Sequence, residues 1–75
     1  LMVKLLKHET ILKPFYIAQS NDQRFHVLYG DRSLSTSDSI VGAIETIPNK
    51  YLYGVSSLST DWERLSPADP NANHS

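Results

Sequence analysis

Three histidines are the side chains of this sequence best suited to acid–base or metal chemistry near neutral pH: His8, His26 and His74. Their spacing puts no two on one helical face, and His8-Glu9 lacks the second histidine of a zinc-protease helix. The chain contains no cysteine, which excludes thiolate zinc sites and disulfide frameworks. No nucleophile stands beside a base. We therefore expect no metal, no cofactor and no catalytic residue, with an enzyme site assembled between subunits as the weaker alternative.

Hydroxyl groups gather in two segments that read Ser-Leu-Ser-Thr, at residues 33–36 and 57–60. Free amides at a helix start, with hydroxyls beside them, can hold an anion. Capping explains the same residues without a ligand, and neither segment has the glycines or the lysine of a phosphate-binding loop. We expect helix caps here, with an anion site as the alternative, at Ser35, Thr36, Ser59 and Thr60.

Basic and aromatic residues interleave between Lys13 and Arg32, a pattern by which a sheet surface can stack bases and hold phosphates. A nucleic-acid-binding regulator that uses residues 13–32 is therefore the alternative function. Strand alternation opposes it, because one face then turns Phe25, Val27 and Tyr29 toward the core. That leaves only a thin opposite face, made of Arg24, His26 and Leu28.

The chain contains an internal repeat: the sequence of residues 28–36 recurs at 52–60 as Leu-Tyr-Gly-x-x-Ser-Leu-Ser-Thr. Only the two residues after the glycine differ. A repeat at a fixed spacing usually marks one supersecondary unit used twice. In each copy we predict a strand that stops at a glycine with positive φ, Gly30 or Gly54, then a polar loop and a hydroxyl-capped helix start.

An apolar stripe at helical spacing predicts the main helix, at Ile40, Val41, Ile44 and Ile47. The hydroxyls of residues 35–37 mark its start, and Asp38 suits the positive end of the helix dipole. Pro48 ends it, because proline disfavours helical geometry in the residue before it. Farther along, residues 60–63 read Thr-Asp-Trp-Glu, which fits a capping box at the start of a short helical turn.

Two β-favouring runs, residues 15–19 and 24–29, flank a turn-rich tetrapeptide and predict a β-hairpin. We also expect a strand at residues 2–7, although residues 2–13 fit neither helical nor strand spacing cleanly. If the strands that end at Tyr29 and Val55 are neighbours, the helix between them makes a right-handed crossover and the strands run parallel. The predicted fold is α+β: a small mixed sheet, built from the hairpin and a βαβ-like unit, with helices on one face.

The sheet face without helices should carry Leu28 and Leu52, and an exposed apolar patch of this kind needs a partner. Trp62 is either a cap on the small core or an interface anchor. We predict that partner-binding residues include the following set: Arg24, His26, Leu28, Arg32, Leu52 and Trp62.

The 75-residue chain is long enough for one domain with a thin core, which we place at residues 1–65. Residues 66–75 read SPADPNANHS and are expected to form a disordered tail. Residues 1–32 hold five basic and three acidic side chains, and residues 33–75 hold two and five. The chain is therefore dipolar, which suits head-to-tail association with a copy of itself.

The net charge of −1 argues against strong nonspecific attraction to nucleic acid or anionic lipid. No stretch resembles a signal sequence or a membrane span, so we expect a cytoplasmic protein that does not bind membranes. We predict a small non-catalytic protein–protein interaction module or regulator, of the adaptor or inhibitor type and oligomeric. Its partner would be another protein, itself or both, with nucleic acid as the less favoured partner.

Overall fold

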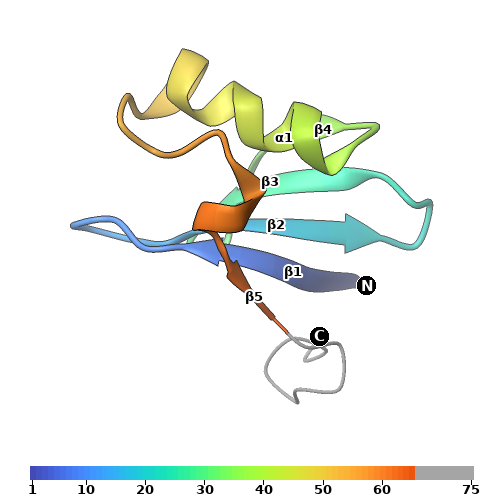
Figure 1. The fold of residues 1–75 in the computed structure, drawn as a ribbon. Helices are drawn as coiled ribbons and strands as arrows, with labels where there is room; N and C mark the ends of the chain where they lie inside the picture. The colour runs from blue at the N-terminus through green and yellow to red at the C-terminus, as the bar shows by residue number, and fades with distance from the viewer. Residues whose placement is uncertain (66–75) are drawn as a thin grey trace.

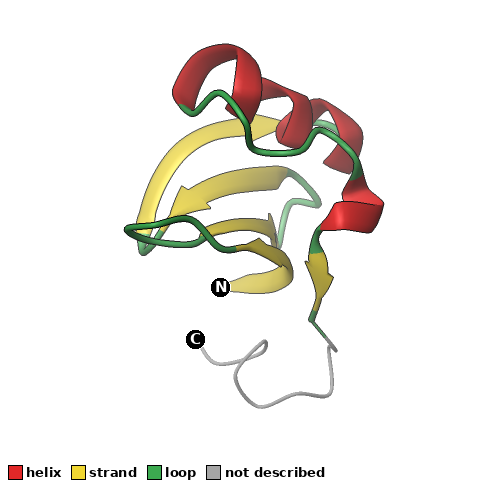
Figure 2. Cartoon of the chain, turned by 60° about the vertical axis from the view of Figure 1, so that its left-hand side comes forward, coloured by secondary structure: helices red, strands yellow, loops and turns green. Residues whose placement is uncertain are grey.

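The computed structural model describes residues 1–65, which form one curved sheet with a helix packed on its concave face (Figures 1 and 2). Five strands run in the spatial order β4-β3-β2-β1-β5, and each pairs antiparallel with its neighbours. The strands are β1 (Met2–His8), β2 (Phe15–Ser20), β3 (Phe25–Tyr29), β4 (Arg32–Ser37) and β5 (Glu63–Arg64). The helical segments are α1 (Ile40–Thr46), the π-helical turn η1 (Ile47–Tyr51) and the 3-10 turn η2 (Ser59–Asp61).

The predicted α+β class is confirmed, together with the β2–β3 hairpin, the strand at the N-terminus, the main helix and a short C-terminal helical turn. The mixed sheet and its βαβ-like unit are wrong. The strand β4 follows β3 directly, through a two-residue turn at residues 30–31, and pairs with it antiparallel. No strand of the described residues lies at 51–55, so the parallel crossover does not exist. The predicted tail lies outside the described residues.

The two copies of the internal repeat adopt unlike structures, contrary to the prediction. Residues 28–36 form the end of β3, the turn and most of β4, whereas residues 52–60 form an irregular loop that enters η2. The residues after the glycine decide the difference. Asp31 is exposed in a hairpin turn, but Val55 is 5 % exposed and packs into the core. Both glycines do have positive φ, 59° at Gly30 and 100° at Gly54, as expected.

The main helix starts later than the hydroxyl cluster indicated. Its N-cap is Ser39, whose Oγ accepts a hydrogen bond from the Gly42 amide at 3.0 Å. Residues 35–37 instead belong to the edge strand β4. Hydroxyl residues suit helix caps and turns, but threonine also favours strands, and here the pairing with β3 decides.

Helical turns continue past the predicted stop. The α-helix ends at Thr46, but the chain goes on through Pro48 in η1, where Leu52 donates to the Ile47 carbonyl at 2.8 Å. Proline is tolerated because it lies in the first turn of η1, where an amide donor is not needed. The predicted capping box is absent, since Glu63 lies in β5 rather than in a helix.

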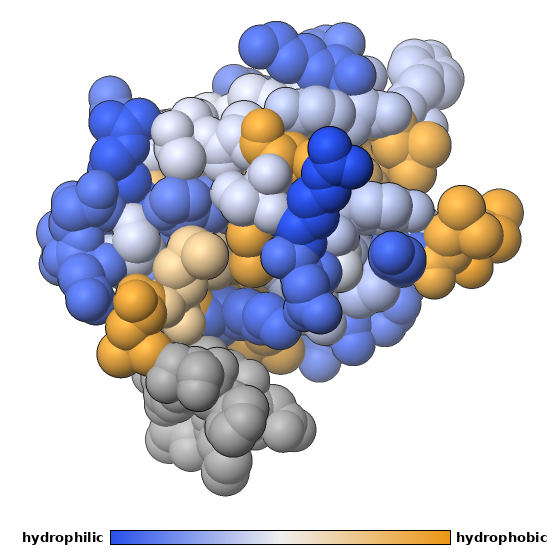
Figure 3. All heavy atoms as spheres, turned by 180° about the vertical axis from the view of Figure 1, so that it is seen from behind, coloured by the Kyte–Doolittle hydropathy of each residue, from blue (hydrophilic) through white to orange (hydrophobic). Residues whose placement is uncertain are grey.

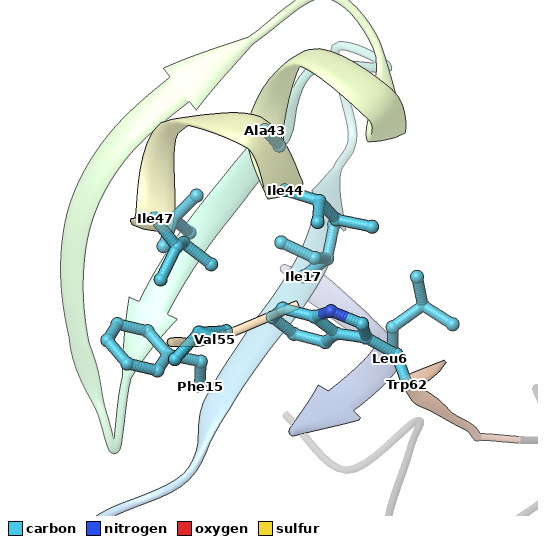
Figure 4. Packing of buried hydrophobic residues seen from close by; sticks show 9 residues of the cluster. Leu6, Phe15, Ile17, Ala43, Ile44, Ile47, Val55 and Trp62 are labelled. Atoms are coloured by element: carbon cyan, nitrogen blue, oxygen red, sulfur yellow. The ribbon is translucent and has the colours of Figure 1, made fainter. Parts of the chain in front are cut away.

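The core lies between the concave face of the sheet and α1, and the loop after η1 closes it (Figure 4). Ile17, Val27, Ile44 and Ile47 are fully buried there. Phe25 and Tyr29 pack against the same cluster, as strand alternation predicted.

The convex face of the sheet lacks the predicted apolar patch. Leu28 is only 5 % exposed, because it lies between its cross-strand neighbours Tyr16 and Ser33. Leu52 does not belong to the sheet at all. Figure 3, which views the molecule from behind, shows mainly hydrophilic residues, with apolar residues exposed at its right side and lower left and smaller apolar patches between them.

Candidate functional site

The residues predicted to bind a partner do not form one surface. Leu28 is buried in the sheet, and Trp62 is 5 % exposed in the core. The indole Nε1 of Trp62 donates to the Ser56 carbonyl at 3.0 Å, and its ring lies 5.2 Å from that of His8. Trp62 therefore caps the core, which was the first of its two predicted roles.

Arg24 and His26 lie where β2 turns into β3. Arg24 forms an ion pair with Asp38 at 3.2 Å and donates to the Thr36 hydroxyl at 3.3 Å. The His26 Nε2 lies 2.8 Å from the Ser20 Oγ. Both side chains thus brace neighbouring strands on the convex face, at the end of the sheet opposite Arg32.

The hydroxyls of the proposed anion site are also dispersed. Ser35 pairs with Val27 on the concave face, whereas Thr36 pairs with His26 on the convex face. Ser59 and Thr60 belong to η2 and, together with Ile40 at the start of α1, line the groove described below. The helix start on which this prediction depended is at Ser39. The anion site therefore stays a prediction without a shared location.

The largest concentration of exposed apolar side chains lies at one end of the molecule, which we call the loop end. It comprises residues 9–14, residues 30–31 and residues 52–54. Ile11 is 100 % exposed, Leu12 82 % and Tyr53 95 %. In Figure 1 the β1–β2 loop and the loop after η1 both reach the left side of the molecule. Leu52, one of the predicted partner-binding residues, lies at this end, and Arg32, another of them, directly follows residue 31 at the start of β4.

The β1–β2 loop is held in one conformation by its own hydrogen bonds. The Thr10 hydroxyl donates to the Lys13 carbonyl at 2.6 Å and accepts from the Leu12 amide at 3.2 Å. The Gly30 amide donates to the Pro14 carbonyl at 2.8 Å, which ties this loop to the β3–β4 turn. Ile11 and Leu12 are therefore presented on an ordered loop, and little conformational entropy remains to be lost on binding.

Two cations lie at or next to the loop end. Lys13 belongs to the β1–β2 loop and contacts the Gly30 turn, Arg32 directly follows that turn, and neither forms an ion pair within residues 1–65. Glu9 is already engaged, because its carboxylate lies 2.9 Å from the Lys7 ammonium and, as a hydrogen-bond partner, raises the pKa of Lys7. The loop end is therefore apolar at its tip and mildly basic at its rim.

A groove opens on another side of the molecule, between the start of α1, η2 and the β1–β5 edge. Its volume is about 930 Å³, and its apolar wall is formed by Leu5, Leu6, Ile40, Trp62 and Leu65. Arg64 is its charged lining residue. The two-residue strand β5 borders this groove and pairs with β1 only at Leu6 and Lys7.

Sequence reasoning missed both the loop end and the groove. The signal for the loop end was present: Ile11 and Leu12 stand between Thr10 and Lys13-Pro14 in a segment that fits neither helical nor strand spacing. Two adjacent aliphatic residues outside any element are candidates for exposure. The groove has no comparable signal, because its walls come from four separate segments.

Comparisons with known proteins leave the fold and the surfaces to be interpreted by themselves. No protein-family model matches this chain, and neither a curated protein nor a solved structure shows significant similarity to it.

Within the part of the chain that the structure describes, no three histidine, aspartate or glutamate side chains come together as metal ligands would. The helical segments of residues 1–65 are all too short to cross a bilayer.

Proposed function

We propose that this chain is a non-catalytic module that binds another protein through its loop end. One observation carries the proposal: Ile11 and Leu12 are 100 % and 82 % exposed at the tip of a hydrogen-bonded loop. Full burial of an aliphatic side chain contributes about 1.5–3 kcal/mol. Two such residues on a preorganised loop offer apolar surface that a groove on a partner can bury with little loss of conformational entropy.

Tyr53 enlarges the proposed contact. Its ring is 95 % exposed beside Gly54, where an added Cβ would meet no atom within 4 Å. Tyrosine offers a large contact area with few rotatable bonds, and it is enriched at interfaces for that reason. The apolar tip with a basic rim also matches the usual arrangement of an interface, in which polar residues surround an apolar centre.

Affinity capture from the native source tests this proposal. The bait is the full chain, compared with the double variant Ile11→Asp/Leu12→Asp. A matched control is Val41→Asp, which alters an aliphatic residue that is 59 % exposed on α1, away from the loop end. We expect a protein that the wild type and the control retain and the double variant loses. Equal retention by all three baits would reject the loop end as the binding surface.

Nucleic acid remains the second candidate, on the convex face. The Lys4 ammonium lies 4.3 Å and that of Lys7 6.0 Å from the centre of the Tyr16 ring, which gives this face a basic and aromatic cluster. However, Phe15 is buried and Phe25 packs against the core, so neither offers a free ring for stacking. The geometry supports this candidate less well than protein binding.

Salt dependence and substitution separate the two candidates. Nucleic-acid binding must weaken steeply with added salt, because condensed counterions are released. The double variant Arg24→Ala/Arg32→Ala should then bind an oligonucleotide more weakly than the wild type. Unchanged affinity for every oligonucleotide tried would remove this candidate and leave protein binding in place.

A further inference from the structure

We infer that the groove beside Trp62 binds a small amphiphilic anion: a free, single-chain carboxylate whose hydrocarbon chain lies along the apolar walls and whose head group pairs with Arg64. The groove is separate from the loop end, so the inference goes beyond the function proposed above and does not depend on it. The class of ligand follows from the apolar walls, the arginine and two hydroxyl groups that line the groove.

The walls provide the place for a hydrocarbon chain. The volume of about 930 Å³ is in the range of small-molecule sites, which combine mainly apolar walls with a few polar groups. Leu5, Ile40 and Leu65 are half-buried, so each keeps apolar surface that a ligand can cover. Trp62 contributes its ring and no donor, because its indole N–H already binds the Ser56 carbonyl.

Arg64 supplies the charge. The β1–β5 ladder pairs Arg64 with Leu6 and Glu63 with Lys7. Paired side chains lie on one face of a sheet and successive residues alternate, so Arg64 shares the groove face with Leu6 while Glu63 lies on the opposite face. Among residues 1–65, Arg64 is the charged residue of the groove lining and forms no ion pair. A guanidinium binds a carboxylate through two parallel hydrogen bonds, which favours an anionic head group here.

Two hydroxyl groups stand in the same groove. Ser59 and Thr60 are exposed residues of η2 that line it, and their hydroxyls can donate to a carboxylate. The neighbouring acid does not oppose an anion from inside the groove, because Asp61 is not part of the lining and accepts from the Ser56 Oγ at 2.5 Å. Ser59 and Thr60 belong to the anion site predicted from the sequence, and Arg64 adds the cation that the hydroxyl pattern lacked.

Titration of the full chain with octanoate tests the inference, with the fluorescence of Trp62, the one tryptophan of the sequence, as the readout. We expect a saturable change below millimolar octanoate. Octanol and octyltrimethylammonium have the same chain without the anion and should bind about three- to tenfold more weakly. From hexanoate to decanoate, each added methylene should strengthen binding by up to about fourfold.

Variants separate the two parts of the site. Arg64→Gln should weaken octanoate binding about three- to tenfold and leave octanol binding unchanged. Arg32→Gln is the matched control, because it removes the same charge at the start of β4, and it should bind as the wild type does. Leu65→Ser should weaken octanoate and octanol alike. Circular dichroism checks folding, and Arg64→Lys replaces Arg64→Gln if the latter is not folded; lysine lacks the two parallel bonds and should also weaken octanoate binding.

The inference is overturned by fluorescence that does not change up to millimolar octanoate, by equal affinities for octanoate and octanol, or by an affinity for octanoate that Arg64→Gln leaves unchanged. Binding of vesicles that contain phosphatidylglycerol, without binding of free octanoate, would place the recognition at a membrane and overturn it as well. Capture of a protein through Ile11 and Leu12 uses the other surface, so each of these results leaves the proposed function standing.

Discussion

Gln23 has a backbone conformation that suits glycine better. Its φ is 69°, in the left-handed region, at the point where the β2–β3 turn closes with a hydrogen bond from the Gln23 amide to the Ser20 carbonyl. A three-residue loop with a left-handed last residue is a common hairpin connection, and glycine is usual there. The side chain partly compensates, because the Gln19 amide donates to the Gln23 Oε1 at 3.0 Å.

Replacement of Gln23 by glycine should therefore stabilise the chain. We expect Gln23→Gly to raise the free energy of unfolding by about 0.5–1 kcal/mol, since the left-handed conformation costs an L-residue roughly 1–2 kcal/mol. Urea unfolding followed by Trp62 fluorescence measures it. Asn21→Gly is the control: φ is not positive there, so it should bring no gain. A loss of stability in Gln23→Gly would show that the amide contact outweighs the backbone strain.

Asp22 makes the same turn sensitive to acid. The Ser20 hydroxyl, and after it the Arg24 backbone amide, hold the pKa of Asp22 below its usual value of 3.8. Because the folded-state pKa is lowered, the stabilisation is present above about pH 4 and is lost as the pH falls through the folded pKa. Asp22→Asn should be less stable than the wild type near neutral pH.

Thermal melts across this pH range test the prediction. The melting temperatures of the wild type and Asp22→Asn should converge as the pH approaches about 2. Ser20→Ala should weaken the pH dependence of the wild type, because it removes the largest cause of the lowered pKa. A constant difference between wild type and Asp22→Asn at every pH would contradict this account.

At the scale of elements, the hydroxyl residues before α1 have two different roles. Residues 35–37 belong to the strand β4, and Ser39 is the N-cap of the helix. Ser35 points from β4 toward the core with a buried Oγ that finds no hydrogen-bond partner among residues 1–65. A lost cap costs about 1 kcal/mol, whereas removal of a buried unpaired hydroxyl relieves a desolvation penalty.

The two serines should therefore respond in opposite ways to alanine. We expect Ser39→Ala to lower the free energy of unfolding by about 1 kcal/mol. Ser35→Ala should leave it unchanged or raise it by up to about 1 kcal/mol. Chemical denaturation of both variants measures the pair. A larger loss of stability in Ser35→Ala than in Ser39→Ala would contradict these roles of the two serines.

Elements with a large buried face could be predicted from the sequence. The alternation of Phe25, Val27 and Tyr29 correctly indicates β3, and the stripe from Ile40 to Ile47 indicates α1, because each pattern is imposed by a large buried face. The strand β4 was not predicted, since its serines and threonine carry little apolar signal and its place is decided by pairing with β3.

Tertiary contacts decide the remaining segments. Residues 51–55 have the β-favouring composition of a strand, yet Tyr51 ends η1 and residues 52–55 form a loop over the core, with Val55 buried. For the candidate surfaces, the predicted binding set contains Leu52, which belongs to the loop end, and Arg32, which directly follows residue 31 of the loop end. Ile11 and Leu12 are not in that set, because exposure of an aliphatic residue cannot be read from its type. The groove depends on where β5 meets β1, a long-range contact that leaves no local pattern.

At the scale of the whole molecule, a thin core supports two separate surfaces. The antiparallel sheet and α1 fix the loop end on one side and leave the groove beside Trp62 on another. The convex face, by contrast, is mainly hydrophilic, and its cations are partly engaged by Asp38 and Glu9 (Figure 3). The most exposed apolar side chains are therefore at the loop end, and the convex face of the sheet has few of them.

The most direct test of this account is the amide spectrum of the full chain, recorded by nuclear magnetic resonance while the captured protein is added. We expect chemical-shift changes centred on residues 9–14 at the loop end. Changes centred instead on Tyr16 and His26 of the convex face would contradict the account, as would a spectrum that does not change when the captured protein is added.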